Sequence, residues 1–269
     1  MSGFRRVKKL SSWRRISLSA WERPSDPSVY GWLDIDVSRA LAFLEARSQA
    51  ASSKITLTHL VGKGLALAIA ESPDVNAIVR RGQHIYARST VDVFFQVAYE
   101  KGGNLSGAKV SRADEKSIEE IASELADRAQ AIRAHEKHEL ARSDQTLGNV
   151  PPLLRKLAMR AVEAATYDFG LNLSAFGVPE DGFGSAMVTN VGMFGLQHGF
   201  APLVPFSRVP IVLTVGAVRD APIAEQGQVV VRPMLSIGVT LDHRVLDGFQ
   251  AGKLAQRFCD VIRDPAAWL

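Results

Sequence analysis

The hydrophobic positions of this chain follow two periods, and the change between them predicts strands and helices. Alternating or short continuous apolar runs bounded by Gly, Pro and polar residues are typical of strands. Segments of this kind occupy residues 30–38, 76–80, 84–88, 91–99, 184–195, 208–218 and 228–241.

Helical periodicity occurs between these segments. Helices are expected from Ser38 to about residue 49 and at 56–72, 116–135, 151–169 and 249–262. Ser117 and Glu120 form a capping box at the start of the third helix, whose apolar stripe consists of Ile118, Ile121, Leu125 and Ile132. Pro73 follows the second helix, and Pro151 and Pro152 begin the fourth.

The order of these elements predicts an α/β fold. Strands and helices alternate, and the long β-branched strands need cover on both faces, from helices or from a partner subunit. No internal repeat and no Gly/Ser or Pro/Ala linker interrupts the chain, so residues 1–269 are expected to form a single domain with a basic N-terminal arm at 1–28.

Composition is that of an ordinary globular protein, with 46% hydrophobic and 22% charged residues in 269. The net charge of +4 is uneven, because the first 23 residues hold seven cations and the single acid Glu22. Such an arm is able to contact nucleic acid or anionic lipid, or to be a solvated terminus that forms salt bridges with the body of the protein. We expect the second, with no nucleic-acid partner.

Several classes of protein are excluded at this stage. The single cysteine, Cys259, permits neither an intrachain disulfide nor a cysteine-based zinc site. The N-terminus lacks the apolar core of a secretory signal, and the apolar run 209–218 is too short to span a bilayer. A cytoplasmic location and no membrane span are therefore expected.

The candidate chemistry centres on "TLDHRVLDGF", residues 240–249. His243 follows a long apolar strand at a junction of the type that holds catalytic side chains, and an imidazole is suited to general base catalysis near neutral pH. Asp247 follows at the turn into the last helix, and Gly248 is expected to allow a tight chain reversal. From these residues alone, a histidine that is simply packed in a turn remains an alternative.

The wider context of His243 resembles a known family. "DHRVLDG" is similar to the H-x-x-x-D-G signature of dihydrolipoamide acyltransferase catalytic cores and of chloramphenicol acetyltransferase, and "AMVTNVGMFG" is similar to that family's "FTISNLGMFG". Thr189 precedes His243 by 54 residues, which agrees with the order and spacing of the two motifs. "LTHLVGKGLALAIAESPDVNA" and "ADEKSIEEIASEL" extend the resemblance over almost the whole chain.

This resemblance implies roles for particular residues. His243 would be the general base that deprotonates an acceptor thiol or hydroxyl, and Thr189 would donate a hydrogen bond to the oxyanion of the tetrahedral intermediate. Asp247 would complete the catalytic set, mainly by pairing with an arginine near the N-terminus, for which Arg14 and Arg15 are the candidates. Asn190 and Gly248 are supporting residues. Without the resemblance, Thr189 is equally a β-branched residue suited to a strand.

The resemblance also implies the assembly and the substrates. The fold would be a chloramphenicol-acetyltransferase-like mixed sheet, assembled as a homotrimer or a higher assembly of trimers. His243 would come from one subunit and Thr189 from its neighbour. The acyl donor would be an acyl-coenzyme A or an acyl-lipoyl thioester, and no metal is expected.

Three departures from the family leave alternatives open. No lipoyl domain, lipoyl-lysine motif or linker is found before the core, so we expect either that another polypeptide supplies the lipoyl group or that the acceptor is something else. The strand "VAYEKGGNLSGAKV" (97–110) also differs from the family's "VATPxGLxxPV", which leaves the acceptor open. A non-catalytic trimeric scaffold is therefore the alternative function. Residues 136–183 are an atypical insertion, interpreted as a surface helix that packs on the trimer, as a lid over an acyl pocket or as an apolar face for a lipid-like substrate.

Other candidate sites are weaker. His135 and His138 lie three apart without the H-E-x-x-H pattern of a zinc site. His198 follows the Thr189 motif in an expected loop, where it either lines the channel or packs. "GKGLALA" lies inside an expected helix and lacks a second phosphate-loop element, which argues against nucleotide binding.

Overall fold

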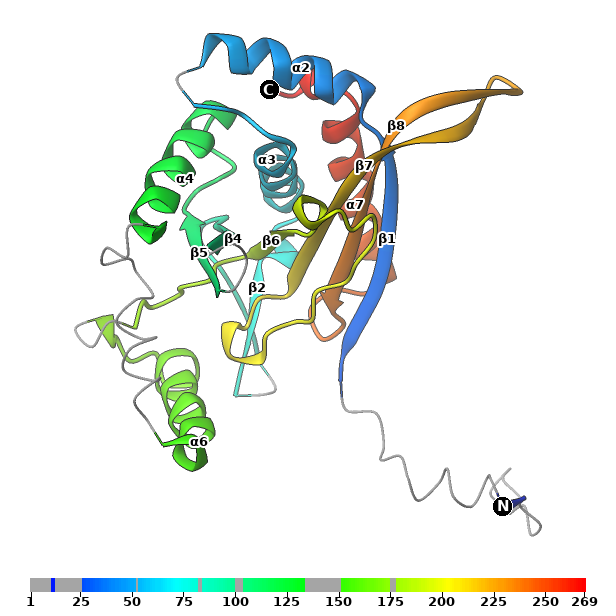
Figure 1. Cartoon of the computed structure of the whole chain (residues 1–269). Coiled ribbons are helices and arrows are strands. Elements are labelled where there is room, and N and C mark those ends of the chain that lie inside the picture. The colour runs from blue at the N-terminus through cyan, green and yellow to red at the C-terminus, as the bar shows by residue number, and fades with distance from the viewer. Residues whose placement is uncertain are drawn as a thin grey trace.

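A mixed six-stranded sheet forms the centre of the molecule, with the strand order β1-β8-β7-β6-β4-β5 (Figure 1). The computed structural model describes residues 11–12, 26–51, 53–81, 84–99, 104–133, 151–174 and 178–269. The strands are β1 (Ser28–Asp36), β2 (Ala77–Arg80), β3 (His84–Ala87), β4 (Val93–Tyr99), β5 (Asn104–Val110), β6 (Ala186–Asn190), β7 (Ile211–Glu225) and β8 (Gln228–Asp242). The helices are α2 (Ser38–Ala50), α3 (Leu57–Ala70), α4 (Ile118–Arg133), α6 (Pro152–Glu163) and α7 (Gly248–Arg263).

Both pairing modes occur in the sheet. β6 runs parallel to β4 and to β7, whereas β1, β8 and β7 form an antiparallel set and β5 pairs antiparallel with β4. β2 and β3 form a separate two-stranded hairpin. The expectation of an α/β protein with a mixed, helix-covered sheet is confirmed.

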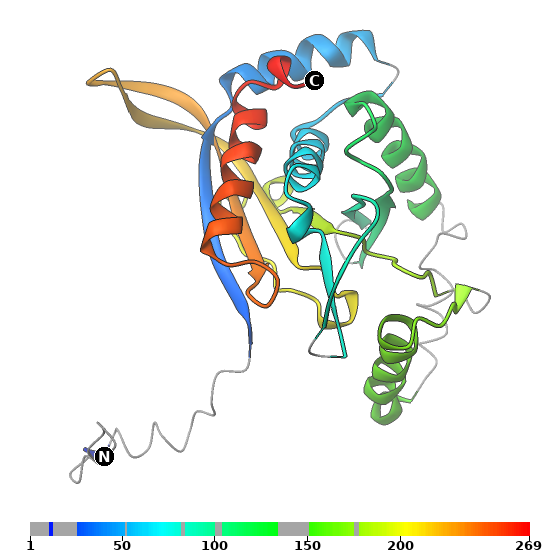
Figure 2. The same ribbon diagram turned by 180° about the vertical axis from the view of Figure 1, so that it is seen from behind.

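Helices α2, α3, α4 and α7 cover one face of the sheet (Figures 1 and 2). α3 is the innermost of them: Leu60, Leu65 and Ile69 are fully or almost fully buried, each contributing on the order of 2 kcal/mol through burial. Gly62 lets α3 approach β4, since a Cβ there would lie 2.1 Å from the Phe95 ring. The apolar pattern of residues 56–72 thus belongs to a central core helix.

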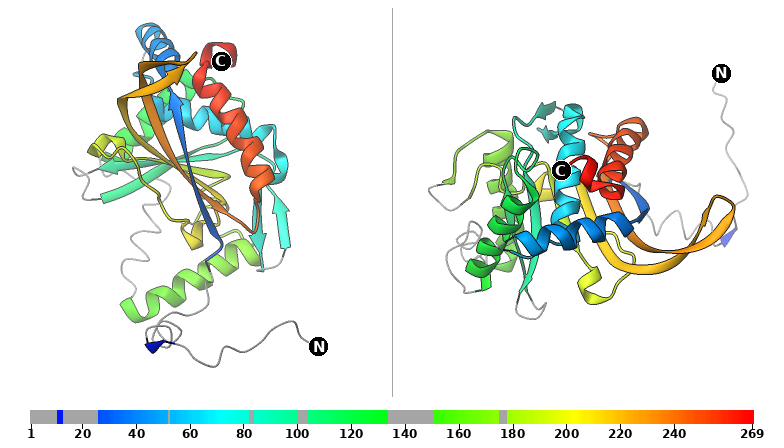
Figure 3. Two further views of the ribbon diagram at one scale, coloured as in Figure 1. Left: turned by 90° about the vertical axis from the view of Figure 1, so that its right-hand side faces the viewer. Right: turned by 90° about the horizontal axis from the view of Figure 1, so that it is seen from above.

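The opposite face of the sheet carries a smaller core and a long loop. Phe94, Met187, Val209 and Val212 form this second cluster. Residues 195–207 run over the strands on this side, as the view from above shows (Figure 3). Within the described ranges, this face therefore has no layer of helices like that of the other face.

Two strand predictions differ from the structure, the one for residues 97–110 and the end of the strand predicted at 208–218. The segment 97–110, expected as one strand, contributes to two antiparallel strands, β4 and β5. β7 continues past residue 218 to Glu225, and the β7–β8 hairpin projects from the body (Figures 1 and 3). Hydrogen bonds to β8 keep residues 219–225 of β7 in the sheet. The pattern of apolar residues along the sequence does not show such pairing between strands.

The predicted helix boundaries are largely confirmed. Ser117 and Glu120 exchange both capping-box hydrogen bonds, at 2.7 and 3.1 Å. α6 begins at Pro152 and continues into a π-helical turn, Ala164–Asp168, close to the expected end at 169. Cys259 is buried in α7. Arg14, Arg15, His135 and His138 lie outside the described residues.

Candidate active site

His243 occupies the turn between β8 and α7. Its backbone N–H donates to Pro27 O at 2.9 Å, and Val245 N and Leu246 N both donate to Asp242 O, which fixes the turn. The side chain of His243 is exposed, and its imidazole forms no hydrogen bond with the described part of the chain. The base is therefore positioned through its backbone and remains accessible to a substrate.

The carboxylate of Asp242, directly before His243, pairs with Arg244 and not with the histidine. The guanidinium of Arg244 donates to both carboxylate oxygens, at 2.6 Å from Nη2 and 2.9 Å from Nε. The same carboxylate accepts from Arg244 N at 3.0 Å, and its side chain is only 9% exposed. This bidentate pair stiffens the turn and leaves Asp242 unavailable as an acceptor for His243.

Asp247 caps the helix that follows. Its carboxylate accepts from Phe249 N at 2.8 Å and from Gln250 N at 3.3 Å, and Gln250 Oε1 accepts from Asp247 N at 3.1 Å. Among the described residues it forms no hydrogen bond with His243. Within one chain Asp247 thus positions the start of α7, and its proposed pairing with Arg14 or Arg15 stays a prediction.

The expected role of Gly248 is wrong in one respect. Its φ is not in the left-handed region, and a Cβ at this position would meet open space. Gly248 is simply the first residue of α7, because the capping box of Asp247 already makes the chain reversal. No contact within the single chain requires a glycine here.

Thr189 lies near the end of β6 on the face that the helices leave open. Side chains alternate along a strand, and Val188 belongs to the helix-side core whereas Met187 belongs to the core of the other face. Thr189 therefore shares the face of Met187. It is partly buried, and its hydroxyl has no hydrogen-bond partner within the ranges that the structure covers.

Asn190 faces the helices and fixes the end of the same strand. Its Nδ2 donates to Thr58 Oγ1 at 2.8 Å, and its Oδ1 accepts from Met193 N at 3.2 Å. The first bond ties β6 to the first turn of α3, and the second closes the short 3₁₀ turn Gly192–Phe194. Asn190 thus holds the strand that carries Thr189.

One chain keeps Thr189 and His243 apart. Thr189 is opposite Thr214 in β7, Thr214 is opposite Gly238 in β8, and His243 follows Gly238 by five residues. With about 3.3 Å per residue along a strand and about 4.8 Å between strands, their Cα atoms are separated by roughly 15–20 Å. The two side chains are not able to act on the same atom within one subunit.

The loop after Thr189 is held on the sheet by residues that the sequence analysis missed. Ala201 N donates to Thr214 Oγ1 at 3.0 Å, and Thr240 Oγ1 donates to Ala201 O at 2.7 Å. A Cβ at Gly216 or Gly238 would lie within 2.0 Å of a loop carbonyl oxygen. Glycines inside strand patterns were the available signal, because they mark close approach by another backbone.

The surface beside Thr189 is apolar. Met193, Phe194, Leu196 and Phe200 are between 47% and 62% exposed. Phe200 makes an edge contact with Tyr30 of β1, which is itself half exposed, and His198 is exposed in the same loop. Large apolar side chains gathered around an open face indicate a surface that another molecule covers.

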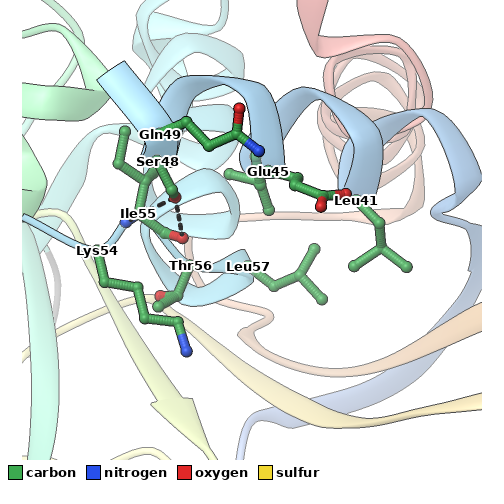
Figure 4. A pocket seen from close by; sticks show the side chains of 9 residues that line it. Leu41, Glu45, Ser48, Gln49, Lys54, Ile55, Thr56 and Leu57 are labelled. Carbon is green, nitrogen blue, oxygen red and sulfur yellow. Dashed lines mark hydrogen bonds between the residues drawn. The ribbon is translucent and has the colours of Figure 1, made fainter. Parts of the chain in front are cut away.

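A groove of about 610 Å³ opens between α2 and the residues before α3 (Figure 4). Leu41, Glu45, Ser48, Lys54 and Thr56 are among the residues that line it, and Ser48 Oγ bonds the backbone of Ile55 at 3.1 Å. The groove lies on the helical side, whereas Thr189 faces away from the helices. It is therefore separate from the Thr189 surface in one chain.

Burial lowers the pKa of His59, which lies near this groove. Desolvation lowers the pKa of His59 to about 4, so the side chain is neutral at pH 7. Its Nδ1 accepts from Thr56 N at 3.2 Å and completes the capping box of α3. His59 is a structural histidine, since its accepting nitrogen is already engaged.

Two further properties of the described residues bear on function. No group of three or more His, Cys, Asp or Glu side chains in this part of the chain is arranged to hold a metal ion. No helix in it has the length and apolar character needed to cross a membrane.

Comparisons with known proteins agree with the two motifs. The family model of the 2-oxoacid dehydrogenases acyltransferase catalytic domain matches residues 6–151 and 179–269. The dihydrolipoyllysine-residue acetyltransferase component of the pyruvate dehydrogenase complex of Bacillus subtilis is 25% identical over 264 residues, covering 96% of this chain and 50% of that protein. The chain spans 28–50% of the length of the curated relatives that it matches.

Solved structures show the same fold. The cubic core of a pyruvate dehydrogenase multienzyme complex superposes with a TM-score of 0.67 at 21% identity, covering 98% of this chain and 94% of that one. A chloramphenicol acetyltransferase superposes with a TM-score of 0.50 at 12% identity, covering 88% and 89%.

Proposed function

The chain belongs to the family of 2-oxoacid dehydrogenase acyltransferase catalytic domains, and on that premise we propose that it transfers an acyl group between a thioester and a thiol or hydroxyl acceptor. The thioester is that of acyl-coenzyme A or of an acyl-lipoyl group. Its curated relatives are named as acyltransferases acting on a dihydrolipoyllysine residue, which supports a dihydrolipoyl thiol as the acceptor. No resident metal takes part in this proposal.

The proposal rests mainly on the distance between His243 and Thr189 within one chain. His243 and Thr189 are both without side-chain hydrogen bonds to the described residues, and one chain holds them roughly 15–20 Å apart. A rotationally symmetric assembly brings the His243 surface of each subunit to the Thr189 surface of the next. We therefore propose a homotrimer whose sites lie between subunits.

The apolar face beside Thr189 supports this assembly. Met193, Phe194, Leu196 and Phe200 would be covered by the neighbouring subunit, which removes their surface from water. One structural neighbour forms a cubic core, and a cube contains threefold axes. An assembly of several trimers is the corresponding larger form.

The proposed chemistry begins with proton transfer to His243. The neutral imidazole accepts the proton of the acceptor thiol, and the resulting thiolate attacks the carbonyl carbon of the thioester. The negative charge moves to the carbonyl oxygen, where the Thr189 hydroxyl of the neighbouring subunit donates a hydrogen bond. Collapse of this intermediate breaks the original carbon–sulfur bond, and the imidazolium returns its proton to the leaving thiolate.

Hydrogen bonds around the site support these two roles. The Pro27 and Asp242 hydrogen bonds orient the turn of His243, and the Asn190–Thr58 bond holds the strand of Thr189. Both reacting groups are therefore placed by rigid elements before the substrate arrives, which lowers the entropy cost of reaching the transition state.

Acyl transfer from acetyl-coenzyme A to dihydrolipoamide tests the proposal. The variant His243→Ala is expected to lose about 10²–10⁴-fold in kcat, as removal of a general base does. His84→Ala changes an exposed histidine on β3 and serves as the matched control. An unchanged rate in His243→Ala would rule out the mechanism, and wild-type protein that binds no acyl-coenzyme A in calorimetry would favour the scaffold alternative.

A further inference from the structure

Between its two matched segments the family model leaves residues 152–178 unmatched, and this stretch contains α6, which exposes large apolar side chains. Leu154 and Leu157 on α6 are 55% and 66% exposed, and Phe169 and Leu171 just beyond the helix are 68% and 52% exposed. We call these four residues the α6 strip. In an ordinary surface helix the apolar side packs on the protein and the polar side faces water. In α6 the exposed side carries Leu154 and Leu157 next to Arg160, whereas Met159 and Val162 are half-buried on the other side.

Ion pairs attach the C-terminal end of α6 and the turn that follows it to the body of the protein. Arg208 donates to Glu163 Oε1 at 2.6 Å and to both carboxylate oxygens of Asp168 at 2.9 and 3.1 Å, and its side chain is only 16% exposed. Asp168 also accepts from Arg81 N at 2.7 Å, and Tyr167 is buried beneath. This end of α6 is thus fixed to the body, and the α6 strip is held outward.

The position of α6 in the molecule leaves the strip accessible. α6 lies at the end of the sheet opposite to α2, away from the four helices that cover the sheet (Figures 1 and 3). All four residues of the strip are more than half exposed, so no helix or strand in the described part of the chain covers them.

The charge of α6 indicates what covers this face. Residues 151–162 contain Arg155, Lys156 and Arg160 and no acid, and the next acid, Glu163, is neutralised by Arg208. A short helix with exposed leucines and an excess of cations complements an anionic apolar surface, and the negatively charged interface of a lipid bilayer has both properties. An acidic protein would satisfy the cations but would not by itself account for the exposed leucines and phenylalanine.

We propose that the α6 strip is a docking surface for anionic lipid membranes. α6 has 12 residues and is about 18 Å long, so it lies in the interface plane and does not cross the bilayer. The leucines enter the boundary between headgroups and acyl chains while the exposed Arg160 contacts lipid phosphates. This contact would hold the protein where acyl groups of membrane lipids are concentrated, independently of the proposed catalysis.

Flotation of the full chain with lipid vesicles tests this inference. Vesicles of phosphatidylcholine with about 30% phosphatidylglycerol are compared with vesicles of phosphatidylcholine alone. Wild-type protein is expected to float with the anionic vesicles only, and the double variant Leu154→Glu, Leu157→Glu is expected to lose at least about fivefold of the bound fraction. Leu154→Met, Leu157→Met retains an apolar strip and is expected to bind like wild type.

Three results would overturn the inference. The first is wild-type protein that does not float with anionic vesicles. The second is flotation that the double glutamate variant leaves unchanged, which would assign binding to the basic residues of 1–28. The third is a changed sedimentation coefficient of the glutamate variant in the absence of lipid, with flotation unaltered, which would place the strip between copies of the chain. None of these readouts depends on acyl transfer, so failure here leaves the proposed function untouched.

Discussion

Thr189 lies in β6 and His243 directly follows β8, so β7 lies between them, and five residues of chain separate His243 from Gly238, the position aligned with Thr189. This relationship predicts complementation between inactive subunits. His243→Ala and Thr189→Ala are each expected to be inactive alone. Coexpressed in equal amounts, they are expected to recover about a quarter of wild-type activity in the whole pool and about a third in isolated mixed trimers, because a site needs an intact histidine from one chain and an intact threonine from the next.

Purified mixtures provide the measurement for this first prediction. The two variants carry different affinity tags, and sequential purification isolates the mixed assemblies before acyl transfer is assayed. Coexpression of His243→Ala with a second tagged copy of the same variant is the control. Mixed assemblies without activity would place the complete site within one subunit.

A second prediction concerns the hydroxyl of Thr189. Thr189→Val keeps the size and β-branching of the strand residue and removes the donor. A loss of about 10²–10³-fold in kcat is expected, with KM for the thioester little changed, because the oxyanion exists only in the transition state. Thr189→Ser restores the donor and is expected to restore most of kcat. Equal rates for the valine and serine variants would contradict the role of the hydroxyl.

A third prediction separates the two readings of Asp247. Asn is as good an N-cap as Asp, so Asp247→Asn is expected to retain both stability and activity, whereas Asp247→Ala is expected to lose about 1 kcal/mol of unfolding free energy. Urea denaturation and steady-state kinetics measure the two effects. If Asp247→Asn is as stable as wild type but loses activity strongly, the carboxylate acts on His243 by its charge, and the cap is only part of its role.

A fourth prediction follows from His59. Burial lowers its pKa from the ordinary 6.5 to about 4, so between these values the unfolded chain binds a proton that the folded chain does not. Stability is therefore expected to fall as the pH decreases from about 6.5 to 4, by on the order of 2–3 kcal/mol from this group. His59→Gln preserves the capping-box acceptor. Its unfolding free energy, measured by urea titration across this range, should decrease less steeply than that of wild type; parallel curves would contradict the assignment.

A fifth prediction concerns the anchor of α6. Arg208→Met removes a buried cation that binds Glu163 and Asp168, and is expected to cost on the order of 3 kcal/mol or to release the segment 152–168. A decrease of the unfolding free energy would show the loss of stability, and faster hydrogen exchange in residues 152–168 would show release of the segment. Arg39→Met is the matched control, because the Arg39–Asp264 pair is exposed and worth less than about 1 kcal/mol. Equal protection of 152–168 in both variants would show that Arg208 does not hold the helix.

The sequence alone determined the elements whose physics is local. The capping box of Ser117 and Glu120 and the proline start of α6 depend on neighbours within a few residues, so spacing was sufficient to predict them. The apolar runs likewise determined that a buried sheet exists, because burial requires a continuous apolar pattern whatever the partner strand. The two motifs also marked His243 and Thr189, whose catalytic roles stay predictions.

The tertiary structure decided what depends on residues far apart in the chain. The strand order places β7 between Thr189 and His243, and no local pattern encodes which strand intervenes. The glycines at 216 and 238 acquire their role only when the 195–207 loop crosses them. The outward face of α6 likewise depends on Arg208, some 40 residues beyond the helix, because a helical pattern shows which side is apolar but not which side is held by the body.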